Sequence, residues 1–183
     1  MLAAAPGGTL TLGSLAAVSG TGTLGSSTTQ ILNQGVILGP QTADGVLTLF
    51  NLTNTGLLSS GPDGLTLVVS GFLINQGTLE LRSTGGIQVT GDFTNSSVGQ
   101  IQVKFFRSFD VGLLQITGTA TLDGTLTVLN AVSGDPTEPV RDQFMIFASR
   151  SGFFATTTFN DIDPLFTAAV DQSDPIALEL VIA

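Results

Sequence analysis

The chain of 183 residues contains neither cysteine nor histidine, and it carries few charges of either sign. Without cysteine there is no disulfide framework, which is compatible with secretion but does not demonstrate it. Charged residues make up 10% of the chain, whereas an ordinary soluble domain has roughly 25%. Threonine, serine, asparagine and glutamine must therefore supply most of the solvated surface, as is common in extracellular β-rich fibres.

Positive charge is especially scarce. The net charge is −9, and eight of the fourteen acidic residues lie between Asp135 and Glu179, so the C-terminal end is the acidic one. Nucleic acid binding requires clustered cations that displace counterions, and an anionic membrane surface attracts the same residues. We therefore expect neither partner. The only cations are Arg82, Lys104, Arg107, Arg141 and Arg150.

Long apolar runs are absent as well. No stretch approaches the roughly 18 residues of a transmembrane helix, so we expect no membrane insertion. The first residues, Met1 to Gly8, lack the basic region of a secretory signal and are too short to be one. Either a signal has been removed or the sequence is a piece of a longer protein, and we favour the second interpretation.

What the sequence does contain is a repeat marked by four asparagines at nearly equal intervals. Each has an apolar residue two positions before it and a glycine shortly after it. A fixed period of roughly 20 residues is typical of repeat architectures, in which each unit buries its apolar face against its neighbour. The asparagines are Asn33, Asn54, Asn75 and Asn95.

Within each unit, apolar and polar residues alternate, as in Thr78-Leu79-Glu80-Leu81 and Gln100-Ile101-Gln102-Val103. This alternation is typical of strands with one buried face. The sequence therefore predicts an all-β fold: a single-stranded parallel β-helix, or solenoid, of about six coils with roughly 21 residues per coil. An antiparallel meander is the alternative, but it does not require a constant period. Two inner columns are predicted: Ile31, Leu52, Leu73, Phe93 and Ala120, and Ile37, Leu58, Leu79, Ile101 and Leu126.

Two features divide the chain. The spacing stretches near Lys104–Gly112, where a short insertion interrupts the repeat, and the period fades after Asn130. We expect residues 1–130 to form the coils and residues 131–183 to form β-rich capping strands and loops, because the end of a stack otherwise exposes unpaired backbone.

The stretch from Leu113 to Phe154 resembles the C-terminal part of autotransporter-type adhesin passenger domains. The resemblance rests on Leu114–Val128, on Asp142–Phe147 and on Ser151–Phe154. It covers about a quarter of the chain and implies a right-handed parallel β-helix displayed on a bacterial surface. No segment of this sequence corresponds to the outer-membrane barrel that follows in that family.

Two sets of residues are candidate sites. The asparagine column is interpreted as a structural ladder in which each side-chain amide bonds the next coil, with a ligand groove as the alternative. The insertion combines aromatic rings with cations, so it is the predicted interaction surface. Its residues are Lys104, Phe105, Phe106, Arg107 and Phe109.

Two further hypotheses compete with simpler explanations. Asp92 and Asp123, near Lys104 and Arg107, could form the carboxylate pair of a carbohydrate-active enzyme, but stray surface charges explain them as well. Threonine pairs such as Thr125 and Thr127 raise an ice-binding hypothesis, although the outward array is not uniform.

Metal ions and glycans are the remaining ligands that the sequence suggests. The acidic segment Asn160–Pro164, with Asp171 and Asp174, offers oxygen ligands for calcium, but its spacing fits no calcium loop. We therefore expect no cofactor and no metal, with calcium as the alternative. The sequon at Asn51 would matter only in a eukaryotic secretory pathway.

These observations predict a non-enzymatic structural or adhesive module at the cell surface or outside the cell. It could associate end to end, because unpaired strand edges are templates for pairing, and its partner could be a surface glycan or protein. The alternatives are a carbohydrate-binding or carbohydrate-active β-helix and an ice-binding protein.

Overall fold

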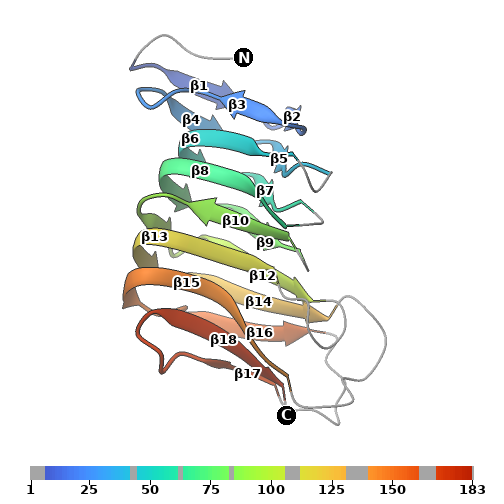
Figure 1. Ribbon diagram of the computed structural model, residues 1–183, viewed down its shortest axis with the longest axis vertical. Coiled ribbons are helices and arrows are strands. Elements are labelled where there is room, and N and C mark those ends of the chain that lie inside the picture. The colour runs from blue at the N-terminus through green and yellow to red at the C-terminus, as the bar shows by residue number, and fades with distance from the viewer. Residues whose placement is uncertain are drawn as a thin grey trace.

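The computed structural model describes residues 7–41, 45–61, 64–82, 85–105, 112–130, 140–160 and 168–182, and the described residues form strands and connections without a helix (Figure 1). The all-β class is confirmed. No helix long and apolar enough to cross a membrane occurs among these residues. The strands are β1 (Thr9–Leu12), β2 (Ala17–Val18), β3 (Gly22–Leu24), β4 (Gln30–Asn33), β5 (Val36–Leu38), β6 (Leu47–Asn54), β7 (Leu57–Ser59), β8 (Gly64–Asn75), β9 (Thr78–Leu81), β10 (Gly85–Val89), β11 (Phe93–Asn95), β12 (Gln100–Phe105), β13 (Leu113–Leu122), β14 (Thr125–Asn130), β15 (Val140–Gly152), β16 (Thr156–Asn160), β17 (Ala168–Asp171) and β18 (Ala177–Ile182).

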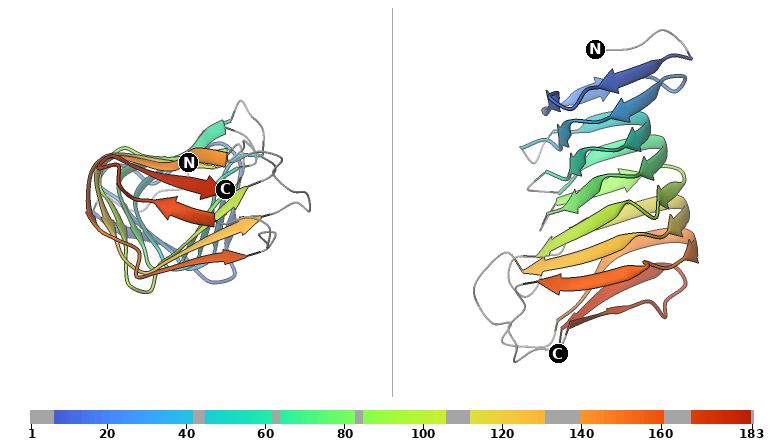
Figure 2. Two further views of the ribbon diagram at one scale, coloured as in Figure 1. Left: turned by 90° about the horizontal axis from the view of Figure 1, so that it is seen from below. Right: turned by 180° about the vertical axis from the view of Figure 1, so that it is seen from behind.

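The strands are arranged in two sheets. The first runs in the order β1-β4-β6-β8-β10-β13-β15-β18-β17, with β3 on β6 and β11 between β8 and β13; the second runs β2-β5-β7-β9-β12-β14-β16. Up to β16, every pair in both sheets is parallel and joins neighbouring repeats, which is not the pairing of an antiparallel meander. Figures 1 and 2 show the strands stacked along the long axis of the molecule.

The first sheet bends along its strands. The register of β6 with β8 shifts between Phe50 and Leu52. In the next repeat the same path is divided between two strands, β10 and β11, which pair with the first and second halves of β8. Viewed along the stack, the strands surround an interior (Figure 2). The buried apolar side chains form one cluster in the core.

Both predicted inner columns are confirmed. Ile31 is in register with Leu52, Leu52 with Leu73, and the column continues through Phe93 to Ala120. The second column, from Ile37 to Leu126, is paired in the same way on the second sheet. All ten side chains are at most 1% exposed. Like residues therefore stack on like residues, and the period of the sequence is the period of the core.

Glycine is required at the corner that follows each asparagine. A Cβ atom at Gly56 would lie 2.1 Å from the carbonyl oxygen of Gly35, and one at Gly77 would lie 2.3 Å from that of Gly56. Real Cβ atoms do not approach backbone oxygens this closely, so any side chain here would push the repeats apart. Gly99 and Gly124 continue this column: a Cβ atom at Gly99 would lie 2.5 Å from the carbonyl oxygen of Asn75, and one at Gly124 would lie 2.3 Å from that of Gly99.

The stack extends beyond the predicted boundary at residue 130. β15 pairs in parallel with β13, and β16 pairs in parallel with β14. Antiparallel pairing begins only with β18, which pairs with β15 and β17. The sequence hides this unit because the interval from Thr125 to its register partner Thr156 is wider than in the earlier repeats, and because no asparagine marks it.

The inner column ends in a charge. The residue in register with Ala120 is Arg150, where every earlier repeat has an apolar residue. Its guanidinium group lies 5.7 Å from the ring centroid of Phe147 and 4.7 Å from that of Phe153, and it donates a hydrogen bond to the carbonyl oxygen of Gln172. A cation over aromatic faces can be accommodated at the border of a core, so the apolar column closes here.

The glycine column can be tested by one substitution. Gly77→Ala should lower the free energy of unfolding by about 1–3 kcal/mol, because its methyl group overpacks against the Gly56 carbonyl. The measurement is urea denaturation followed by circular dichroism.

The control is Gly13→Ala. A Cβ atom at Gly13 meets nothing within 4 Å, so this variant should keep or slightly raise the wild-type stability, because alanine reduces the entropy of the unfolded chain. Equal stability of the two variants would contradict the close packing at the corner.

Candidate interaction surface around Lys104

The four asparagines form a continuous chain of hydrogen bonds along the stack. The side-chain nitrogen of Asn33 donates to the side-chain oxygen of Asn54 at 2.7 Å, Asn54 to Asn75 at 2.9 Å, and Asn75 to Asn95 at 2.7 Å. All four residues are fully buried. This is the geometry that the sequence analysis expects of a ladder, and a groove for a ligand would need these amides to be accessible.

Each amide also serves the backbone. The second hydrogen of Asn33 reaches the carbonyl oxygen of Leu57, and the oxygen of Asn33 accepts from the backbone nitrogen of Gly35. Asn54 and Asn75 bond the corresponding carbonyls one repeat further on. Buried backbone groups at a tight corner need such partners, because leaving one unbonded costs about 1–3 kcal/mol.

The predicted interaction surface lies partly outside the described residues. Phe106, Arg107 and Phe109 lie there, and Phe105 is described only as a backbone position at the end of β12. Lys104 is described, and its partner is Glu80. The ammonium nitrogen of Lys104 donates to Oε2 of Glu80 at 2.5 Å.

Glu80 is the centre of a cluster on the outer side of the second sheet. Its Oε1 accepts hydrogen bonds from Nε of Arg82 at 2.6 Å and from the hydroxyl of Ser59 at 2.9 Å. The side chain of Glu80 is only 8% exposed, whereas those of Arg82 and Lys104 are 43% and 30% exposed. Two cations thus flank one carboxylate, and both cationic side chains are partly exposed. We call Glu80, Arg82 and Lys104 the Glu80 cluster.

The pKa of Glu80 reflects two opposing effects. Burial raises the pKa of the carboxyl group, but the hydrogen bonds from Lys104, Arg82 and Ser59 and the charge of Lys104 outweigh it. The net result is a pKa below its ordinary value. Glu80 is therefore a permanent anion near neutral pH, and it holds the two cations in place.

The sequence does not reveal the Glu80 cluster. The alternation of Leu79, Glu80 and Leu81 correctly places Glu80 on the outer side, where a solvated array is expected. In the structure Ser59 and Glu80, which are in register, are both buried. The alternation of apolar and polar residues predicts which face of the sheet a side chain lies on, but not whether neighbouring side chains bury it. The spacing of Arg82 and Lys104 from Glu80 was the signal in the sequence that could have revealed the cluster.

The two aspartates of the proposed carboxylate pair accept hydrogen bonds from different backbone groups. Oδ1 of Asp92 accepts a hydrogen bond from the backbone of Thr119, and Oδ1 of Asp123 accepts one from the backbone of Gly124. Thr119 and Asp123 are four residues apart, about 13 Å along a strand. The two aspartates therefore serve different corners of the same wall, and the cation Lys104 is bound to Glu80 instead.

The remaining candidates are only partly described. Asp161 to Pro164 lie outside the described residues, and Asp171 and Asp174 each cap a backbone nitrogen two residues further on. Among the described residues, no three acidic, histidine or cysteine side chains gather as metal ligands would. The amide nitrogen of Asn51 donates to the carbonyls of Ser27 and Thr29, and a glycan on it would replace one of these two donor hydrogens.

The threonine array is partly self-bonded. The hydroxyls of Thr127 and Thr158 lie 3.1 Å apart, and the amide nitrogen of Gln100 donates to Thr127 at the same distance. Thr127 is only 5% exposed. Hydroxyls bonded to one another are less available to order external water, which agrees with the non-uniform array seen in the sequence.

The chain was compared with protein-family models, with curated proteins and with solved structures, and none of them matches it.

The ladder predicts a large effect from one amide. Asn54→Ala would leave the donor of Asn33 and the acceptor of Asn75 without partners in the core, so the free energy of unfolding should fall by about 2 kcal/mol or more. Equilibrium urea unfolding measures the change. The matched control is Gln76→Ala, an exposed position that follows Asn75 at the next corner, and its stability should remain near that of the wild type. A comparable loss of stability in both variants would contradict the ladder.

The Glu80 cluster predicts an acid-dependent stability. Because the folded pKa of Glu80 is lowered, its contribution is complete above the unfolded value near 4.5 and is lost as the pH falls through the lower folded value. Glu80→Gln should destabilise the protein at pH 7 and flatten the fall in stability below pH 4.5. Thermal unfolding between pH 2 and pH 7 measures both effects.

Lys104→Met is the companion variant. Without the ammonium group the folded pKa of Glu80 rises toward its unfolded value, so the acid loss of stability should be smaller than in the wild type and should end at a higher pH. If Glu80→Gln and the wild type show parallel stability curves at every pH, the cluster does not contribute as described.

Proposed function

We propose that the two sheets are the walls of one single-stranded parallel β-helix, and that this solenoid serves as a stiff structural or adhesive module at the cell surface or outside the cell. The observation that carries the proposal is the uninterrupted register from β2 to β16. Each step joins a residue to its equivalent one repeat further on. A stack held in this way cannot bend at one repeat without breaking ladder bonds on two sheets.

Surface chemistry supports the same proposal. The outward column on the second half of the first sheet consists of Thr11, Leu32, Thr53, Ile74, Thr94, Thr121 and Ser151. Hydroxyl and aliphatic side chains share this column without a charge. Such a wall is suited to lateral contacts with neutral surfaces, and the resemblance of Leu113–Phe154 to adhesin passenger domains supports display outside the cell.

A second candidate is binding of an acidic carbohydrate at the Glu80 cluster. One specific observation favours it: the guanidinium group of Arg82 and the ammonium group of Lys104 are held side by side by one buried carboxylate while both remain partly exposed. Two oriented cations can pair with a carboxylate or sulfate group on a glycan.

The stiff solenoid can be tested by distances between spin labels. The chain has no cysteine, so Thr11→Cys with Thr121→Cys labels one outward column without background. These positions are five strand steps apart, which is about 24 Å. Pulsed electron paramagnetic resonance should give a narrow distribution near that value, plus the reach of the labels.

A second pair provides the control. Thr23 and Gln115 lie on the other half of the same first sheet and are four strand steps apart, or about 19 Å. The two distributions should differ by one strand spacing. Broad distributions would refute the stiff module. Saturable binding to acidic glycans that Lys104→Ala abolishes, without a change in these distances, would favour the second candidate instead.

A further inference from the structure

The outer face of the second sheet changes from apolar to polar along the stack. On β5 and β7, three of the four outward positions are aliphatic: Val36, Leu38 and Leu57. Beyond the Glu80 cluster, on β12, β14 and β16, two outward columns in register carry only amides and hydroxyls. We call them the polar band; the columns are Gln100, Thr125 and Thr156, and Gln102, Thr127 and Thr158.

Side chains of the polar band are bonded to one another. Nε2 of Gln102 donates to Oε1 of Gln100 at 3.1 Å, and Nε2 of Gln100 donates to the hydroxyl of Thr127 at 3.1 Å. The hydroxyl of Thr158 donates to the same oxygen at 3.1 Å. Each amide nitrogen carries a second hydrogen. The bonds hold the amides in place before a ligand arrives, which lowers the entropy that binding must remove.

The polar band is accessible and lies beside positive charge. Gln100 and Gln102 are half-buried, and Thr156 and Thr158 are exposed. Gln102 is in register with Glu80, so the band begins one strand step from the Glu80 cluster. Two of the three cationic side chains that the structure describes belong to that cluster. A ligand with an acid group and several hydroxyls would find partners for both here.

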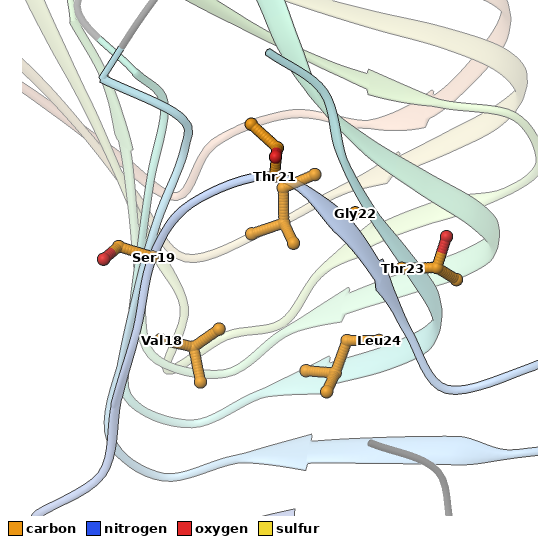
Figure 3. Close-up of a pocket in the computed structure, with 7 residues that line it drawn as sticks. Val18, Ser19, Thr21, Gly22, Thr23 and Leu24 are labelled. Atoms are coloured by element: carbon orange, nitrogen blue, oxygen red, sulfur yellow. The ribbon is translucent and has the colours of Figure 1, made fainter. Parts of the chain in front are cut away.

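A hollow beside β3 offers a different surface. It has a volume of about 410 Å³, and Val18 and Leu24 face each other across it (Figure 3). Among the residues that the structure describes, those that line the hollow include hydroxyl groups but no charged side chain. An acid group would have no partner in the hollow, so the polar band is the better match for an acidic ligand.

We propose that the polar band binds the neutral sugars of an oligosaccharide whose single acid group pairs with Arg82 and Lys104. The inference rests on the second candidate function, and it adds the course and the composition of the ligand. The sugar chain runs across the strands from β9 to β16. From Glu80 to Thr158 there are three strand steps of about 4.8 Å each, which is about the length of one sugar ring in an extended chain.

The direction of the ligand follows from the outward columns. Towards β5 the cluster is followed by Leu57 and Val36, whose side chains offer no hydrogen bond. Towards β16 the amides and threonine hydroxyls both donate and accept, as sugar hydroxyls do. The chain of sugars therefore extends from the cations towards β16.

The composition of the ligand follows from charge. Along β14 and β16, the described outward positions carry no cation, so further acid groups would lie over neutral side chains. The net charge of −9 also repels a polyanion. One acid group followed by neutral sugars satisfies both conditions.

The experiment is isothermal titration calorimetry on the full chain with three probes. They are glucuronic acid, neutral xylotriose, and xylotriose with one glucuronic acid linked to its end. The acidic tetrasaccharide should bind roughly tenfold more tightly than glucuronic acid, because its neutral sugars add hydrogen bonds. Xylotriose alone should show no saturable binding.

Glutamine substitutions supply the matched variants. Gln100→Ala with Gln102→Ala should weaken the tetrasaccharide by roughly tenfold and leave glucuronic acid unchanged. Gln88→Ala with Gln115→Ala removes two half-buried glutamines from the outer face of the first sheet and should change neither affinity. Circular dichroism should show wild-type folding in both variants.

The direction is tested by two substitutions that keep the shape of the side chain. Thr158→Val removes a hydroxyl on the β16 side and should weaken the tetrasaccharide. Val36→Thr adds a hydroxyl on the β5 side and should leave its affinity unchanged. The opposite result would overturn the proposed course.

The outcomes separate this inference from the candidate function on which it rests. Equal affinities for glucuronic acid and the tetrasaccharide, both abolished by Lys104→Ala, would overturn the polar band and keep the cation site. Equally tight binding of xylotriose and the tetrasaccharide would overturn the role of the acid group. If neither acidic probe binds, the second candidate function fails, and this inference fails with it.

Discussion

The spacing between paired strands, about 4.8 Å, is the constraint on which the rest of this structure depends. Within the sheets this spacing accommodates any side chain, because side chains point away from the sheet on either face. At a corner the backbones of successive repeats approach along the same line, and the carbonyl of one repeat occupies the place where the next would carry a Cβ atom. Glycine at the corners is therefore the condition for stacking at all, and the four buried amides are what holds the corner in register once it is stacked.

The buried polar groups of this protein form two arrangements with different consequences. The asparagine chain is repeated, neutral and fully satisfied, so it strengthens every repeat in the same way. The Glu80 cluster occurs once, carries charge and makes stability depend on pH. A buried charge of this kind stabilises only while its partners are in place. The first arrangement belongs to the repeat, and the second distinguishes one repeat from the others.

The features that could be predicted from the sequence are those set by the repeat period. The two inner columns, the parallel register and the position of Asn33 to Asn95 follow from like residues recurring at one spacing. Three things did not follow. The last unit was hidden because the interval from Thr125 to Thr156 is wider than in the earlier repeats and Arg150 occupies an apolar position. The burial of Glu80 depends on cross-strand neighbours, which alternation within one strand does not report. The antiparallel pairing of β18 with β15 and β17, which closes the first sheet, has no counterpart in the parallel repeats that the period describes.

The hydrogen-bonded asparagine side chains also give the stack a net dipole direction. From Asn33 to Asn95 every side-chain nitrogen donates toward the C-terminal end, and the last nitrogen ends on the carbonyl oxygens of Gly99 and Asp123. Four buried amide dipoles that point the same way polarise one another, so each hydrogen bond is strengthened by those beside it. Reversing a single amide would set two like atoms against each other at both of its neighbours. The asparagine column therefore has a direction along the stack, and all four amides must take the same orientation together.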